Sequence, residues 1–198
     1  MEYLIANQNR ILTREQLAVK IWGYENERMG SLVKQLLQLA RTENVAVQTE
    51  RPDFSRIVSG ELLPFESVAF EHKLTLETDI SDGIFVSGDA GRLKQPVSIL
   101  IDNAIRHSES GGQVYVALKS ERGEARLSVI NDGEEIPADR RELIFERFYR
   151  TDDSRGDDGH FGLGLVIAKA ITDSYKGKTG VSCHDGKIEF YAVIPQGK

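Results

Sequence analysis

The sequence of 198 residues contains a single cysteine, Cys183. One cysteine excludes an internal disulfide and any metal site built from several cysteines, and it suits a reducing compartment. No stretch approaches the roughly 18 consecutive apolar residues that a membrane-spanning helix needs. The start, MEYLIANQNR, also lacks the pattern of a signal peptide. We therefore expect a cytoplasmic chain with no membrane segment of its own.

Positive charge is also in short supply, because 25 Lys and Arg face 31 Asp and Glu and give a net charge of -6 at pH 7. This balance argues against a general nucleic-acid-binding protein. The hydrophobic share of 40% and the charged share of 28% are ordinary for a globular protein. The length accommodates one good-sized domain with an appendage rather than two full domains.

Residues 1–24 have the pattern of a short helical unit. Thr13 and Gln16 form a capping box, and Gly23 marks the end of the helix. This piece resembles the start of the winged-helix DNA-binding domain of two-component response regulators. The resemblance stops before any recognition helix, so we expect a remnant of that domain and no DNA binding.

Residues 25–43 form the next unit, and its apolar positions recur at helical spacing. Such a seam with charged flanks is expected to pack against another helix, either as a core helix or as a dimer contact. The seam consists of Met29, Leu32, Val33, Leu36, Leu37 and Ala40.

The remaining residues, 44–198, mix helical and strand patterns without a regular alternation. This order favours an α/β two-layer sandwich with a mixed, largely antiparallel sheet covered on one face by helices. Asp53 and Asp89 are the expected caps of the first two helices. Helices are expected at 54–72, 89–108, 139–149 and 161–175, strands at 74–80 and 83–87, hairpins at 113–119 with 124–130 and at 179–183 with 187–193, and a mobile polar stretch at 151–160.

The helix expected at 89–108 has an apolar stripe and a polar flank. Asn103, Arg106 and His107 are three and four residues apart, so these side chains point in similar directions. An amide, a guanidinium and an imidazole suit a phosphate chain with bound Mg²⁺. A solvated edge of the helix is the alternative interpretation of this segment alone.

Four segments in order strengthen the phosphate interpretation. They are ILIDNAIRHS (99–108), VINDGEEIP (129–137), IFERFYR (144–150) and GHFGLGLVIAK (159–169). In the last, glycines precede a helix whose N–H groups can then face an anion. In order and spacing, the four resemble the N, G1, F and G2 boxes of sensor histidine kinases, in the ATPase group that includes gyrase and mismatch-repair proteins.

The resemblance covers residues 54–195 and implies a Bergerat-type ATP-binding fold. It makes residues 25–43 similar to the second helix of the kinase dimerisation hairpin, and residues 44–198 the ATP-binding catalytic domain. A full-length kinase of this kind can be membrane-anchored. Asn103 then takes the place of the Mg²⁺ ligand. The implied nucleotide-binding residues are Asn103, Arg106, His107, Asn131, Gly133, Ile136, Arg147, Arg150, Gly162, Leu163, Gly164 and Leu165.

The sequence departs from the family pattern at several of these positions. Asn131 replaces the aspartate that accepts the adenine amino group, and an amide accepts with less charge assistance. Glu135 replaces the second glycine of the G1 box. His160 stands at a common glycine of the G2 box, and Ile99 stands at a frequent asparagine. These departures put adenine affinity and lid movement in question.

The family also needs an acceptor histidine, followed by Glu or Asp and then by a proline four residues on. None of the four histidines in this sequence fits. We therefore expect a kinase catalytic domain that uses ATP and Mg²⁺ and phosphorylates a histidine on another chain, without self-phosphorylation. The expected partners are that chain, a response regulator and a second copy through 25–43. The alternatives are an anti-sigma-type protein-serine kinase and a non-catalytic nucleotide- or partner-binding module.

Overall fold

The structure is a computed structural model that describes residues 50–147, 149 and 162–197. The chain divides into two units, residues 1–37 and 38–198, and every described residue belongs to the second. The units expected at 1–24 and 25–43 and the stretch at 151–160 lie outside the described residues. No helix in the described part of the chain is long and apolar enough to cross a membrane.

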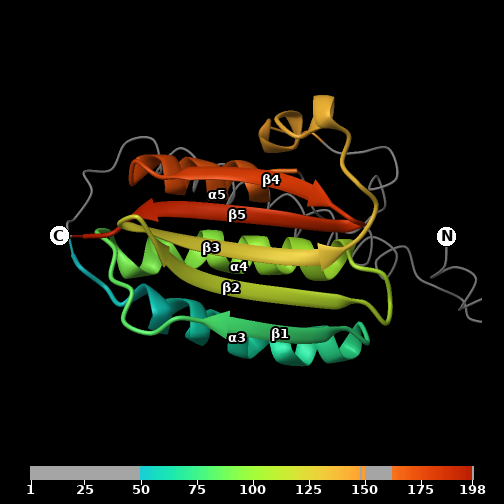
Figure 1. The fold of residues 1–198 in the computed structure, drawn as a ribbon, viewed down its shortest axis with the longest axis horizontal. Coiled ribbons are helices and arrows are strands. Elements are labelled where there is room, and N and C mark those ends of the chain that lie inside the picture. Colours follow the sequence, from blue (N-terminus) through green and yellow to red (C-terminus); the bar gives the residue numbers. More distant parts are fainter. Residues whose placement is uncertain (1–49, 148, 150–161, 198) are drawn as a thin grey trace, which may run out of the picture. The chain divides into compact units, whose positions relative to one another are not determined.

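A five-stranded sheet forms one layer of the domain (Figure 1). Its strand order is β1-β2-β3-β5-β4. The β1 and β2 strands pair in parallel, and all other neighbours are antiparallel. The strands are β1 (Thr75–Ile80), β2 (Gln113–Glu121), β3 (Glu124–Asp132), β4 (Lys178–His184) and β5 (Lys187–Pro195).

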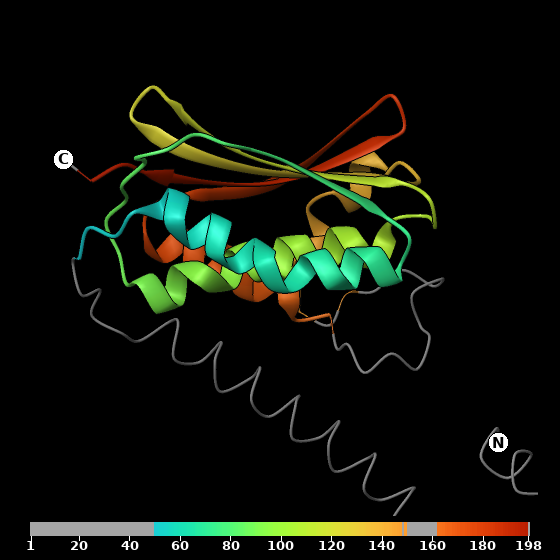
Figure 2. The same ribbon diagram turned by 90° about the horizontal axis from the view of Figure 1, so that it is seen from below.

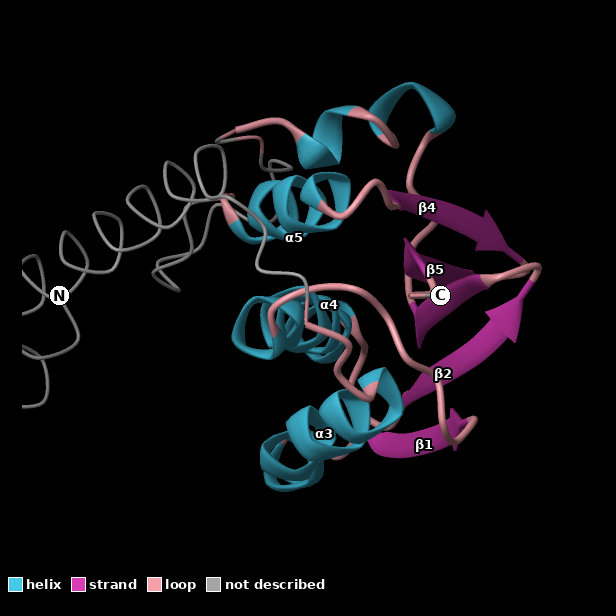
Figure 3. Cartoon of the chain, turned by 90° about the vertical axis from the view of Figure 1, so that its left-hand side faces the viewer, coloured by secondary structure: helices cyan, strands magenta, loops and turns pink. Residues whose placement is uncertain are grey.

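Helices cover one face of this sheet, and within the described part of the chain no helix covers the other, which we call the uncovered face (Figures 2 and 3). The three helices are α3 (Phe54–Glu71), α4 (Ala90–His107) and α5 (Gly164–Ser174). The middle helix, α4, contacts both α3 and α5. The predicted two-layer sandwich, with a mixed and largely antiparallel sheet, is therefore confirmed.

The core lies between α4 and the inward-facing side of the strands. The predicted apolar stripe of α4 is fully buried, since Leu93, Leu100 and Ile101 are 0% exposed. Alternate residues of the central strands meet this stripe, as the period of two in a strand requires. They include Val114, Val116, Leu118, Leu127, Val129, Phe190 and Ile194.

Local sequence signals account for the helix starts and the hairpin turns. The carboxylate oxygens of Asp53 and Asp89 accept hydrogen bonds from the N–H groups of Arg56 (3.1 Å) and Arg92 (2.7 Å), so both predicted caps are confirmed. Both hairpin turns place two central residues at positive φ, as turns of type I′ do. These residues are Arg122 with Gly123 and Asp185 with Gly186.

Three predicted elements differ in the structure. The strand expected at 83–87 is wrong, because this segment forms only two isolated bridges. β1 pairs in parallel with β2, which requires a long crossover, and α4 lies in that crossover. The predicted helix at 161–175 begins only at Gly164, because Gly162 has a left-handed φ of 67°.

The helix expected at 139–149 is also wrong. Two short 3-10 turns take its place, η1 (Ala138–Arg140) and η2 (Leu143–Phe145). The N–H groups of Phe145 and Glu146 bond three residues back, to the carbonyls of Glu142 and Leu143. The Phe145 side chain is buried, and η2 contacts α5, so tertiary packing overrides the helical preference of this segment.

Candidate functional site

The polar flank of α4 lies in its last two turns. Asn103 is half-buried, and Arg106 and His107 are exposed. The Arg106 guanidinium is paired with Asp102, with Nε 2.8 Å from Oδ2. The sequence prediction omitted Asp102, although its spacing of four from Arg106 on one helix is the signal that could have revealed the pair.

Asn131, at the end of β3, is the most enclosed polar residue of the predicted site, with 1% of its surface exposed. Its Nδ2 donates to the backbone carbonyl of Asp132 at 3.1 Å. Its Oδ1 is buried and has no hydrogen-bond partner among the described residues. A buried acceptor without a donor is costly, so this oxygen is well suited to a donor that a ligand supplies.

Gly133 brings the end of β3 against the end of α4. A Cβ at this position would lie 3.3 Å from Nδ2 of Asn131 and 3.4 Å from the carbonyl oxygen of His107. The Gly133 N–H also donates to the Gly186 carbonyl at 3.2 Å. Two of the four predicted segments, 99–108 and 129–137, therefore meet here, and a side chain at 133 would require its neighbours, first Ile188, to move slightly.

The start of α5 adds the third segment. A Cβ on Gly164 would lie 3.5 Å from Cγ2 of Ile99, so this glycine faces the middle of α4. Leu163 is fully buried and anchors the turn, while Leu165 is half-buried. No side chain of a described residue caps this helix N-terminus, and its N–H groups suit an anion.

Residues 133–137 continue from Gly133 into η1, and an arginine that the sequence prediction missed holds them. The Arg141 Nε donates to the Ile136 carbonyl at 3.0 Å, and its Nη2 lies 2.8 Å from Oε1 of Glu135. Ile136 itself is half-buried. The signal in the sequence for this ion pair was the opposite charge of Glu135 and Arg141, which are six residues apart on either side of Pro137. Glu135, which departs from the family pattern, is therefore paired.

The IFERFYR segment is only partly described. Phe145 is buried, in agreement with core packing, and Arg147 is exposed. Arg150 and His160 lie outside the described residues. Within residues 50–147, 149 and 162–197, no three His, Cys, Asp or Glu side chains are grouped to hold a metal. A Mg²⁺ site of one protein oxygen plus phosphates would not need such a group.

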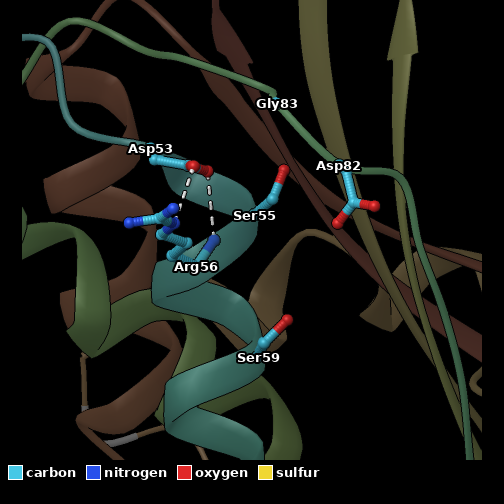
Figure 4. A pocket seen from close by; sticks show the side chains of 6 residues that line it. All are labelled: Asp53, Ser55, Arg56, Ser59, Asp82 and Gly83. Carbon is cyan, nitrogen blue, oxygen red and sulfur yellow. Dashed lines mark hydrogen bonds and ion pairs between the residues drawn. The ribbon is translucent and has the colours of Figure 1, made fainter.

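A polar hollow of about 420 Å³ lies elsewhere, at the N-terminus of α3 (Figure 4). Its lining residues are Asp53, Ser55, Arg56, Ser59, Asp82 and Gly83. Asp53 already caps α3 and pairs with Arg56 at 3.4 Å. The hollow adjoins the segment that leads into the N-terminal end of α4. The predicted site lies at the other end of this 18-residue helix, which is roughly 27 Å long.

The shifted pKa values among the described residues belong to the uncovered sheet face. Burial raises the pKa of Glu189, but hydrogen bonds from Ser128, Arg126 and Ser182 outweigh burial and leave it below its usual value. The hydrogen bond from Lys119 is the main cause that lowers the pKa of Asp79. These groups pair on the face of the sheet opposite to that of Asn131.

Comparisons with known proteins bear on the family and the fold of this chain. Residues 88–198 match the family described as histidine kinase-, DNA gyrase B-, and HSP90-like ATPase. The sensor protein DltS of Streptococcus agalactiae is 36% identical over 173 residues, which cover 86% of this chain and 44% of DltS. The sensor histidine kinase YkoH of Bacillus subtilis is 34% identical over 161 residues, or 80% of this chain and 35% of YkoH. The chain thus spans less than half the length of these relatives.

Solved structures show the same fold. Full-length ShkA in complex with AMPPNP superposes with a TM-score of 0.78 at 25% identity, covering 96% of this chain and 41% of ShkA. The histidine kinase AdeS of Acinetobacter baumannii superposes with a TM-score of 0.74 at 25% identity, covering 100% of this chain and 92% of the AdeS chain.

Proposed function

Because this chain belongs to the family of histidine kinase-, DNA gyrase B- and HSP90-like ATPases, we propose that it binds Mg-ATP at the C-terminal end of α4 and acts as the catalytic domain of a sensor histidine kinase. The observation that carries this proposal is the buried, unpartnered Oδ1 of Asn131. The residues proposed for this site come from α4, from the end of β3 and from the start of α5.

Asn131 accepts the amino hydrogen of adenine in this proposal. Its Nδ2 is held by the Asp132 carbonyl, so Oδ1 is the atom left for the base. This orientation allows an amide to take over from the aspartate of the family pattern. Gly133 and Ile136 border the base, because a side chain at 133 would crowd Asn131 and the end of α4.

The phosphates lie between α4 and the N-terminus of α5. Gly162, Leu163, Gly164 and Leu165 supply a helix start without a capping side chain. The Asn103 amide oxygen, a hard ligand, would hold Mg²⁺, which neutralises charge on the phosphates. Arg106, His107, Arg147 and Arg150 are the proposed positively charged or hydrogen-bonding contacts to phosphate or to the partner helix.

The proposed reaction is phosphoryl transfer to a histidine presented by another chain. A ring nitrogen of that histidine bonds to the γ-phosphorus, the bond to the bridging oxygen breaks, and ADP leaves. Catalysis of this step depends on positioning and electrostatics, which the site residues supply. The proposed partners are the chain with the acceptor histidine, a response regulator, and a second copy through residues 25–43.

Calorimetric titration with ATP, with and without Mg²⁺, tests this function on the wild type and on Asn103→Ala. We expect wild-type binding to strengthen with Mg²⁺ and the variant to lose that gain while it keeps Mg²⁺-independent binding. A wild-type chain that binds no ATP would contradict the proposal. Strong acid-labile phosphorylation of the chain incubated alone with ATP would contradict the need for a separate acceptor.

A further inference from the structure

Residues 133–137 are held at both ends by contacts from different parts of the chain. At the start, the Gly133 N–H donates to the carbonyl of Gly186, in the turn between β4 and β5. Near the end, the Ile136 carbonyl accepts from Nε of Arg141 at 3.0 Å. Five residues that connect β3 to η1 therefore have a fixed position, although they form neither helix nor strand.

One guanidinium makes both contacts near Ile136. While Nε of Arg141 bonds to the Ile136 carbonyl, Nη2 lies 2.8 Å from the Glu135 carboxylate. The fixed fork of a guanidinium suits such a double contact, whereas a lysine has one nitrogen and cannot reproduce it. The Arg141 side chain is 30% exposed and that of Glu135 is 65% exposed, so Arg141 lies inside and Glu135 outside.

We propose that Arg141 and Glu135 are a pair of positioning residues that hold 133–137 as the base-side wall of the nucleotide site. This inference rests on the proposed function. Glu135 keeps the guanidinium in the orientation in which Nε reaches the Ile136 carbonyl. Arg141 in turn neutralises a carboxylate that would otherwise repel a nucleotide.

The pair also connects the base-side wall to the next segment of the chain. Arg141 lies between η1 and η2, and η2 contacts α5. The buried Phe145 of η2 anchors this segment. A shift of residues 133–137 is therefore resisted through Arg141 by the same segment that packs on the helix proposed to face the phosphates.

A double-mutant cycle tests the pair, with Arg141→Gln, Glu135→Gln and the double variant titrated with ADP and with ATP. We expect each single variant to weaken both ligands about three- to tenfold, and the double variant to be no weaker than the weaker single variant. Arg141→Lys should not restore binding. Arg140→Gln and Glu142→Gln, exposed neighbours, are the matched controls and should bind as the wild type does.

The outcomes separate this inference from the proposed function. If the wild type binds nucleotide and the single variants bind it equally well, the proposed role of the pair is overturned and the proposed function stands. The same holds if the losses of the two single variants multiply in the double variant. A loss for Arg141→Gln only, larger with ATP than with ADP, would indicate charge repulsion without positioning and would also overturn it. A lower thermal midpoint of the nucleotide-free variants would assign a merely structural role. Absence of wild-type binding would overturn the proposed function and this inference together.

Discussion

The two ends of α4 differ in how completely the protein satisfies its own polar groups. Beside the segment that leads into the N-terminal end of α4, Ser55 of α3 donates to the Ser81 carbonyl at 2.7 Å and accepts from the Ile84 N–H at 3.0 Å. The Asp89 N–H donates to the Tyr175 hydroxyl at 3.1 Å. At the C-terminal end, Oδ1 of Asn131 has no partner among the described residues, and no side chain caps α5.

We therefore assign a structural role to the N-terminal end and propose that the C-terminal end receives a ligand. Buried polar groups are normally hydrogen-bonded, so a buried acceptor left open needs an explanation. The described residues contain one other such atom, the Thr179 hydroxyl, at the end of β4 opposite the Asp185–Gly186 turn, so an open polar atom is not confined to the C-terminal end of α4. Asn131 differs from Thr179 because two of the predicted site segments, 99–108 and 129–137, meet beside it at Gly133.

The largest expected effect is a loss of stability when the hydrogen bonds near the N-terminal end of α4 are removed. Ser55→Ala removes both bonds of a side chain that is 3% exposed and leaves the Ile84 N–H and the Ser81 carbonyl without that partner. We expect the free energy of unfolding to fall by about 1–3 kcal/mol, with no change in ATP affinity.

Urea unfolding and ATP titration of this variant are the measurements, and Ser59→Ala is the control, because Ser59 is an exposed serine on the same helix. A loss of ATP affinity in Ser55→Ala without a loss of stability would break the comparison between the two ends.

A smaller effect comes from the carboxylate of Glu189 on the uncovered sheet face. Hydrogen bonds from Ser128, Arg126 and Ser182 leave its pKa below the usual value in the folded state. Its contribution to stability is therefore present above the unfolded-state pKa and is lost as the pH falls through the folded-state pKa. The unfolding free energy of the wild type should fall more steeply with acid than that of Glu189→Gln.

Unfolding of both proteins between neutral pH and about pH 3 measures this effect. ATP affinity at neutral pH should be the same for both, since the Glu189 side chain lies on the face of the sheet opposite to that of Asn131. If the unfolding free energies of the two proteins change equally with pH, Glu189 does not contribute to the loss of stability in acid.

Local signals in the sequence were enough to predict those helices and turns whose ends are determined by residues close by in the chain. Asp53 and Asp89 start their helices, and the Arg122–Gly123 turn closes its hairpin, because these contacts form within a few residues. The strand predicted at 83–87 was wrong because β1 pairs with β2, which follows α4 in the sequence, and not with the segment that comes directly after it. The helix at 139–149 was wrong because the burial of Phe145 decides the backbone there.

The site shows the same limit. The sequence identified Asn131 and Gly133 by type and order, but the hydrogen bond from Nδ2 to the Asp132 carbonyl, which leaves Oδ1 open, is visible only in three dimensions. Glu135 looked like a disruptive charge because its partner, Arg141, lies beyond a proline in a segment read as helix. Contacts that cross a turn of unknown shape cannot be inferred from spacing alone.

The most direct measurement compares two ligands, ATP and purine riboside triphosphate, which lacks the amino group of adenine. The account predicts that the wild type binds ATP at least about tenfold more tightly, because only ATP supplies a donor to Oδ1 of Asn131. Asn131→Leu should bind both ligands with the same, weaker affinity while it remains folded. Equal wild-type affinity for the two ligands would contradict the assignment of the open acceptor to the nucleotide base.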